Sequence, residues 1–383
     1  MFFKTFGGAL GVTVIGLVLA FFYGGTTGLA VAAILGVLEV SVSFDNAVVN
    51  ATYLGRLNDF WQKMFLTVGV LIAVFGMRLL FPVIIVCLTA KITPAQAYHL
   101  AMNGGSVHTP GTYANLLQAA HPAIAAFGGM FLLMLFLEFV FEDRELTWLS
   151  WLERPLARIG KLDQVAVAVA AVVLVIAANT LAPEGKTVTV LMAGIFGLVT
   201  YLVVNGLGGL FEAEEEDGDD VPGETSMPGI HGTPEDVERA VSRRATARVI
   251  GLAGKAAFGV FLYLEVLDAT FSFDGVIGAF AITSDPIIIA IGLGIGAMYI
   301  RSLTVFLVRR GTLSEYVYLE HGALWAIGAL AVLLLITIEY EVPEVVTGLI
   351  GAGFIGAAFI SSLVRNRRSP DEEEHVELAT AGT

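Results

Sequence analysis

The chain has 383 residues, of which 56% are hydrophobic and 15% charged, and its mean hydropathy is +0.79. A soluble globular fold is excluded for most of the chain, because soluble domains carry roughly a quarter charged residues. The formal net charge of −14 says little about partners, because eleven acids lie in 212–238 and five in 371–377. No nucleic-acid partner is expected.

Ten apolar runs follow one another along the chain. Each is about as long as, or longer than, the roughly 20 residues that cross a bilayer as a helix. The runs are continuously apolar and do not alternate, which predicts helices and not a β-barrel. The expected spans are 6–23, 27–54, 64–90, 122–141, 165–182, 188–210, 249–282, 286–308, 320–339 and 343–364. The fold class is therefore predicted to be an all-α polytopic membrane protein embedded in a lipid bilayer.

The segments between the spans have their own character. Residues 91–121 are expected to hold a short surface helix, and 143–164 an amphipathic interfacial helix anchored by Trp148 and Trp151. The acidic loop 211–248 and the tail 365–383 are hydrophilic and poor in aromatic residues, a composition typical of solvated, disordered segments.

Basic residues set the expected orientation, because Lys and Arg gather in cytoplasmic loops. With both termini cytoplasmic, sixteen basic residues fall in inner loops, and only Lys91 and Lys186 fall in outer loops. We therefore predict a multi-pass protein of the plasma membrane. Its expected units are a first repeat of five spans, 1–182, and a second repeat of five spans, 183–364.

A polar motif occurs twice within these apolar runs. "LEVSVSFDNAVV" at 38–49 matches "LDATFSFDGVIG" at 267–278, and the similarity continues into the next span with a small gap. The matched pairs are Glu39 with Asp268, Ser43 with Ser272, Asp45 with Asp274, Asn46 with Gly275, Gly69 with Gly292 and Arg78 with Arg301. Because each half has an odd number of spans, the second copy is expected to enter the membrane upside down. Inverted repeats of this kind place transporter sites near the midplane.

Acids at that depth are expensive and normally face a cavity, a partner or an ion. They could pair with Arg78 and Arg301, or be protonated and hydrogen-bonded to nearby serines and asparagines. Four matched acids against two matched arginines leave excess negative charge, which favours a hard-cation site with oxygen ligands. The candidate ligands are Glu39, Asp45, Asn46, Glu265, Asp268 and Asp274, with Ser43, Asn50, Arg78, Ser272 and Arg301 in support.

The helical register leaves one question open. Residues 39, 43, 46 and 50 share a helix face, whereas Asp45 is turned about 120° from Glu39. Either the helix is broken near "SFDN", or Asp45 acts separately as a proton carrier.

At these residues the chain resembles the TerC family of integral membrane proteins, in its branch labelled a domain of unknown function. The resemblance is carried by "EVSVSFDNAVVNA", "EVLDATFSFDGVIGAFAIT", "GLGIGAMYIRSLTVFLVRRGTL" and "YLEHGALWAIGALAVLLLI". It implies a place in the LysE exporter superfamily, a link to tellurium resistance, export of divalent metal, mainly manganese, and a metal role for the acidic motif. The departure at Gly275 implies unequal halves.

The expected function is a secondary transporter that exports divalent cations, Mn²⁺ or Ca²⁺, in exchange for counter-ions such as protons. No cofactor and no enzymatic activity are expected. An intramembrane aspartyl hydrolase is a competing hypothesis, as is a non-transporting scaffold in a metal or tellurium stress-response complex. Glu138 is a candidate supporting group, and His99, His108 and His121 are expected to be solvated.

Overall fold

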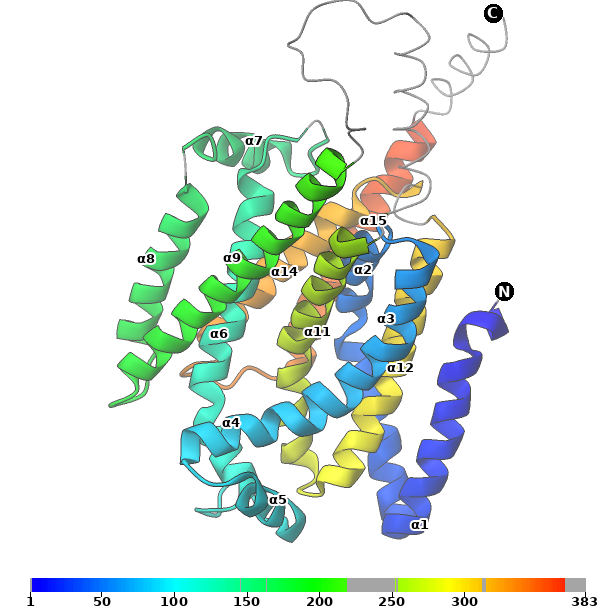
Figure 1. Cartoon of the computed structure of the whole chain (residues 1–383), viewed down its shortest axis with the longest axis vertical. Coiled ribbons are helices and arrows are strands. Elements are labelled where there is room, and N and C mark those ends of the chain that lie inside the picture. The colour runs from blue at the N-terminus through cyan, green and yellow to red at the C-terminus, as the bar shows by residue number, and fades with distance from the viewer. Residues whose placement is uncertain are drawn as a thin grey trace, which may run out of the picture.

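The computed structural model describes residues 2–144, 146–162, 164–218, 252, 254–311 and 315–368. Within these ranges every regular element is a helix, and the single β-bridge is an isolated parallel one between Leu57 and Leu252. Figure 1 shows a bundle of long helices that run roughly parallel or antiparallel, with the short helices α5 and α7 at opposite ends.

The first half of the chain forms eight elements. They are α1 (Phe2–Val42), α2 (Phe44–Leu54), α3 (Asp59–Leu71), the π-helical segment η1 (Ile72–Leu80), α4 (Phe81–Ala90), α5 (Pro94–Asn103), α6 (Tyr113–Phe141) and α7 (Ser150–Ile159). The second half continues with α8 (Val165–Thr180), α9 (Thr187–Gly218), α11 (Gly254–Ile282), α12 (Pro286–Arg309), α14 (Leu319–Ile336) and α15 (Glu344–Arg368).

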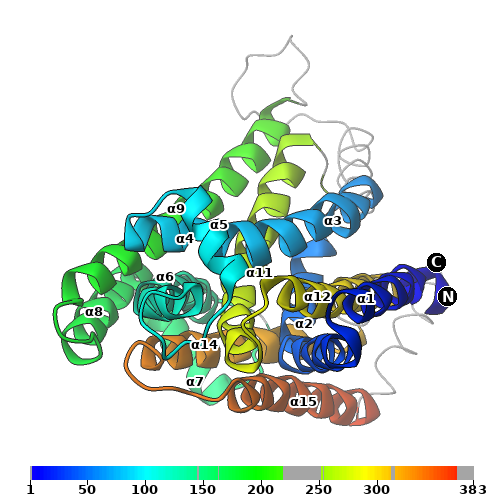
Figure 2. The same ribbon diagram turned by 90° about the horizontal axis from the view of Figure 1, so that it is seen from below.

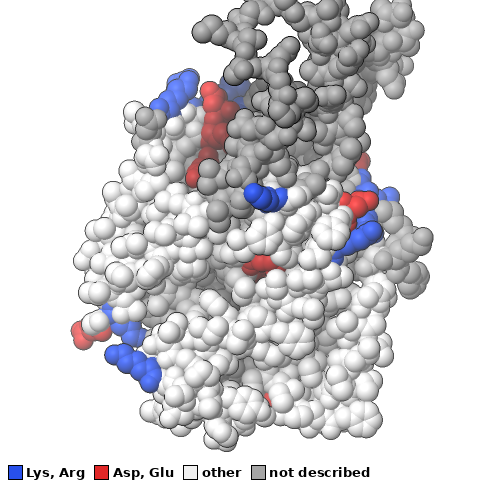
Figure 3. Space-filling view, viewed as in Figure 1, with Lys and Arg blue, Asp and Glu red and all other residues white. Residues whose placement is uncertain are grey.

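Seven helical stretches in the described part of the chain are long and apolar enough to cross a membrane. They are Thr5–Ser41, Asp59–Ala90, Tyr113–Phe141, Thr187–Gly206, Pro286–Arg309, Leu319–Ile336 and Val346–Arg367. Figure 3 shows a broad uncharged surface that carries only scattered charged groups. The protein is therefore an all-α, multi-pass membrane protein whose apolar belt lies in the lipid bilayer.

Helix α1 is a hairpin of two legs. Gly25 has φ 64° and ψ −153°, a conformation that glycine adopts without a side-chain clash. Ile295 of α12 lies against both Gly16 on the first leg and Gly36 on the second. The two legs therefore run side by side against α12, as Figure 1 also shows.

Small residues let the second leg of α1 approach α12 closely. Gly292 and Gly296 form a G-x-x-x-G pattern on α12, and a Cβ atom at Gly292 would lie 2.6 Å from the Cβ of Leu35. Close packing of this kind holds helices together in lipid, where burial of apolar surface gives little net driving force. The contact carries Glu39, one turn after Leu35, into the interior of the bundle.

The second region of dense packing surrounds α6. Figure 2 shows α6 between α14 on one side and α9 on the other, with α11 nearer the middle of the bundle. The fully buried Phe131 and Met134 belong to this cluster. The carboxylate sites described below lie between the α1–α12 side and this core, where α2 and α11 meet.

Both predicted surface helices are present, as α5 and α7. Trp151 is 75% exposed, as expected of an interfacial anchor. Trp148 lies just before α7, and its Nε1 donates a hydrogen bond of 3.1 Å to Ser361 on α15. The acidic stretch 219–251 and the tail beyond 368 lie outside the described residues.

Candidate functional site

The first acidic motif lies at a break between two helices. Helix α1 ends at Val42, Ser43 has φ −95° and ψ 17°, and α2 begins at Phe44. Of the two alternatives that the sequence left open, the structure therefore has the broken helix. The second copy of the motif has no such break, because α11 is a continuous helix through Ser272.

Glu39 is held by Arg78. The side chains of Arg78 and Glu39 are 3% and 4% exposed, and Arg78 Nη2 donates a hydrogen bond to Glu39 Oε1. Arg78 Nη1 donates to the backbone carbonyl of Ala73 at 3.0 Å. The arginine lies in η1, and π-helical segments occur frequently at functional sites. Here the segment places a guanidinium beside a carboxylate from a helix 39 residues away in sequence.

Arg301 is the centre of a second buried cluster. Its Nη1 donates to Glu265 Oε1 at 3.1 Å and to the Phe65 carbonyl at 2.9 Å. Its Nη2 donates to Glu265 Oε2 at 3.1 Å and to Asp268 Oδ2 at 2.9 Å. The guanidinium carbon also lies 4.1 Å from the centroid of the Phe65 ring. The forked geometry of arginine lets one side chain bind both carboxylates.

Three glycines make room for these charged groups. A Cβ atom at Gly275 would lie 2.9 Å from Glu39 Oε2, and one at Gly296 would lie 2.4 Å from Glu39 Cγ. A Cβ at Gly69 would lie 2.3 Å from Arg301 Nη1. The departure from a strict repeat at Gly275 thus has a physical reason, because Asn at that position would occupy the space of the Glu39 carboxylate.

A small cavity lies between these elements. Its walls are formed by Glu39, Ser43, Asn46, Arg78, Asp268, Ser272, Ala297 and Ile300. The space open to the centre of a water-sized sphere is about 10 Å³, close to the least that holds one water. The cavity therefore suits one water or one cation and excludes an organic substrate. The hydroxyl of Ser272 is buried without a hydrogen-bond partner.

Not every predicted site residue lines this cavity. Glu265 and Arg301 lie in the adjoining ion-pair cluster, and Asn50 is buried further along α2. The backbones of Asp45 and Asp274 belong to α2 and α11, but their side chains lie outside the described residues. No cluster of three or more His, Cys, Asp or Glu side chains suited to a metal occurs in the described part of the chain.

The charges of the described groups do not balance. Glu39, Glu265 and Asp268 face only Arg78 and Arg301, which leaves one negative charge when all five are ionised. An unpaired charge in a medium of low dielectric is costly. The cluster therefore has a place for one proton or one cation beyond the arginines.

Glu138 belongs to a different polar group. Its Oε2 accepts hydrogen bonds from the Tyr201 hydroxyl at 2.7 Å and from Asn205 Nδ2 at 3.1 Å. Both donors lie on α9, so Glu138 joins α6 to α9 and does not line the carboxylate cavity. Its role as a supporting group of the acidic motif stays a prediction.

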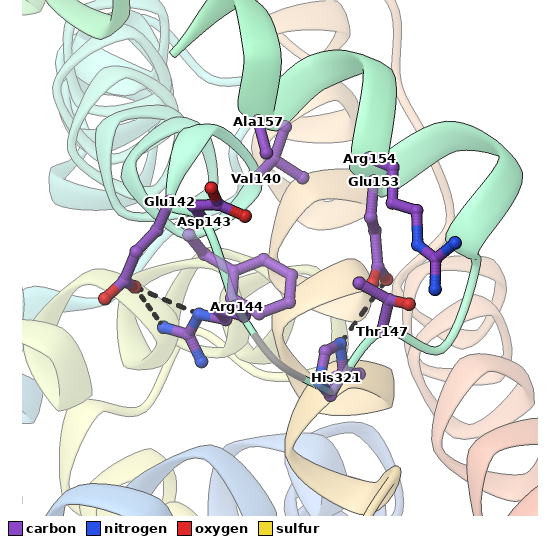
Figure 4. Close-up of a pocket in the computed structure, with 10 residues that line it drawn as sticks. Val140, Glu142, Asp143, Arg144, Thr147, Glu153, Arg154, Ala157 and His321 are labelled. Carbon is purple, nitrogen blue, oxygen red and sulfur yellow. Dashed lines mark hydrogen bonds and ion pairs between the residues drawn. The ribbon is translucent and has the colours of Figure 1, made fainter. Parts of the chain in front are cut away.

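Sequence reasoning missed Glu153. Its carboxylate accepts from the Trp148 and Leu149 backbone N–H groups at 3.0 and 3.2 Å and from Trp325 Nε1 at 3.0 Å. Figure 4 shows Glu153 and His321 directed towards each other, with 3.4 Å between Oε1 and Nδ1. Burial alone would raise the pKa of Glu153, but these hydrogen bonds outweigh it and the net pKa is lowered.

The comparisons with known proteins assign no activity. A family model described as "Protein of unknown function (DUF475)" matches residues 44–369. An "Uncharacterized membrane protein STKORF319" of Myxococcus xanthus is 26% identical over 112 residues, which make up 29% of this chain and 34% of that protein. No solved structure matches. The identification as a TerC protein is therefore wrong, because the model that matches most of the chain is that of DUF475.

Proposed function

The chain belongs to the family described as Protein of unknown function (DUF475), and from the site we propose a secondary transporter that moves a divalent cation in exchange for protons. The cation would pass through the cavity that Glu39 and Asp268 line. Carboxylates must lose their protons to bind metal, so the same groups would couple the two ions.

One observation carries the proposal: a cavity of about 10 Å³ in a cluster with more carboxylates than guanidiniums. Two carboxylates, one amide, two hydroxyl groups and the Arg78 guanidinium surround the space, and the oxygen ligands among them suit Ca²⁺ or Mn²⁺. A purely structural cluster would be expected to balance its charges. In the described residues this cluster has three carboxylates and only two guanidiniums, so one positive charge is missing.

We propose further that the membrane is crossed ten times, in two inverted repeats of 1–182 and 183–364. The two legs of α1 would each cross, as would α8 with 16 residues and α11 with 29 residues. The ion pairs support the repeat, because Glu39–Arg78 and Asp268–Arg301 join matching positions of the two copies. Both termini and the acidic loop would be cytoplasmic.

The test is ion flux in vesicles that contain only the purified protein. Mn²⁺ and Ca²⁺ are offered with a proton gradient in either direction, and both ions and pH are followed. Asp45→Asn and Asp274→Asn should abolish flux at equal protein content, whereas Asp59→Asn, an exposed acid in the first turn of α3, should not. The proposal fails if the unmodified protein carries neither ion, and that result would favour the scaffold.

A further inference from the structure

Asn50 is the most unusual polar side chain of the bundle. It is 0% exposed, and neither Nδ2 nor Oδ1 has a hydrogen-bond partner. A buried polar group without a partner costs about 1–3 kcal/mol, and such groups in native proteins normally have a bound water or ion. An amide that lacks partners for both its donor and its acceptor suits water better than a bare cation, because water can both accept and donate.

The position of Asn50 connects two features already described. It lies one helical turn after Asn46, which lines the carboxylate cavity, and one turn before Tyr53. Ser43, Asn46 and Asn50 follow the spacing of one helix face. A polar row therefore runs along α2 from the cavity towards the α7 end of the bundle.

A pair of tyrosines lies at the far end of this row. The Tyr53 and Tyr263 hydroxyl groups are 3.4 Å apart, and their ring centroids are 4.9 Å apart. Beyond them, the exposed Arg56 has its guanidinium carbon 5.4 Å from the centroid of the Tyr53 ring. Asn50 is therefore about 9 Å along the helix from a charged, solvated residue. The tyrosine pair lies between the two.

We propose that Asn50 holds water in a passage that joins the carboxylate cavity to the α7 end of the bundle, and that the Tyr53–Tyr263 pair closes this passage in the present structure. The closed tyrosine pair explains why Asn50 has no exposure to solvent. Opening would require the tyrosine rings to separate, which breaks one hydrogen bond. The identity of the ion that the passage conducts rests on the proposed function. The presence of water in the passage does not, because hydration can be measured without transport.

The first experiment measures whether water reaches residue 50. Asn50→Cys is placed in a Cys87→Ser background and treated with a charged, water-soluble thiol reagent applied from each side of the vesicle. We expect labelling from the α7 side only, and at least ten-fold faster than for Val48→Cys. Val48 is 2% exposed and belongs to the apolar core, so it is a matched control on the same helix. Equal rates at the two positions would overturn the passage.

Two further variants distinguish a hydrated passage at Asn50 from a purely structural role of this residue. Tyr263→Phe removes one hydroxyl of the closing pair and should raise the labelling rate of residue 50 several-fold. Asn50→Leu replaces the unpartnered amide by an apolar group of similar volume. It should leave the melting temperature unchanged or higher, because Asn50 has no protein partner to lose and an apolar group of the same shape can replace the amide and its water without a net loss, while proton-coupled flux falls at least ten-fold.

The outcomes distinguish this inference from the proposed function. If Asp274→Asn abolishes flux and Asn50→Leu leaves it unchanged, the cation takes another route, and the claim that the passage conducts it is wrong. If the unmodified protein carries neither ion but Asn50→Cys is labelled from the α7 side, the hydrated passage stands and the transport proposal fails. A melting temperature lowered by Asn50→Leu would show that Asn50 has a structural partner.

Discussion

The Arg301 cluster allows a quantitative test of whether the buried acids are held as ions. Arg301→Met keeps much of the side-chain volume but removes four hydrogen bonds, one to Phe65, two to Glu265 and one to Asp268. Breaking one side of a buried ion pair costs about 3–5 kcal/mol, because an uncompensated charge remains. We expect a loss of that size, since Arg301 is 1% exposed.

The informative comparison is the variant that removes the charges as well. Arg301→Met combined with Glu265→Gln and Asp268→Asn leaves no unpaired carboxylate, so its loss should be less than half that of Arg301→Met alone. Unfolding in mixed micelles, followed by the fluorescence of the four tryptophans, measures both. Arg367→Met, at an exposed position near the end of α15, is the control. If the triple variant is as unstable as the single one, the carboxylates are not ionised.

Three other predictions follow from particular contacts. Gly275→Ala should lower the melting temperature and slow flux, because its Cβ would press on a carboxylate oxygen of the first motif, whereas Gly356→Ala meets open space and should change neither. The lowered pKa of Glu153 means that its contribution to stability is present above about pH 4.3, the pKa of an unfolded glutamate, and is lost as pH falls through the lower folded value. Tryptophan fluorescence should report release of α7 in that acid range, and an unchanged spectrum would contradict the assignment. Single cysteines at Gly218 and Glu184 in a cysteine-free background should react from opposite sides of the membrane, and reaction of both from one side would refute the ten-span orientation.

The broad architecture could be predicted from the sequence because it depends on local composition. Continuous apolar runs can satisfy their backbone groups in lipid only as helices, and the runs in the sequence correspond to helices of the structure. The turn at Gly25 could be predicted for the same reason, since the polar stretch "YGGTTG" interrupts the first apolar run. The repeated motif also placed Glu39 and Asp268 among the candidate groups, and both line one cavity.

The partners of those groups were decided by tertiary packing. Composition gave an excess of acids, but only the approach of η1 and α12 determined that Arg78 binds Glu39 and that Arg301 binds both Glu265 and Asp268. Glu153 gave no distinctive sequence signal, because an acid in an amphipathic helix is common, and the helical spacing placed Asn50 beside the motif without showing that its amide lacks partners. Their significance comes from burial and from the presence or absence of hydrogen-bond partners, which depend on how helices distant in sequence pack together.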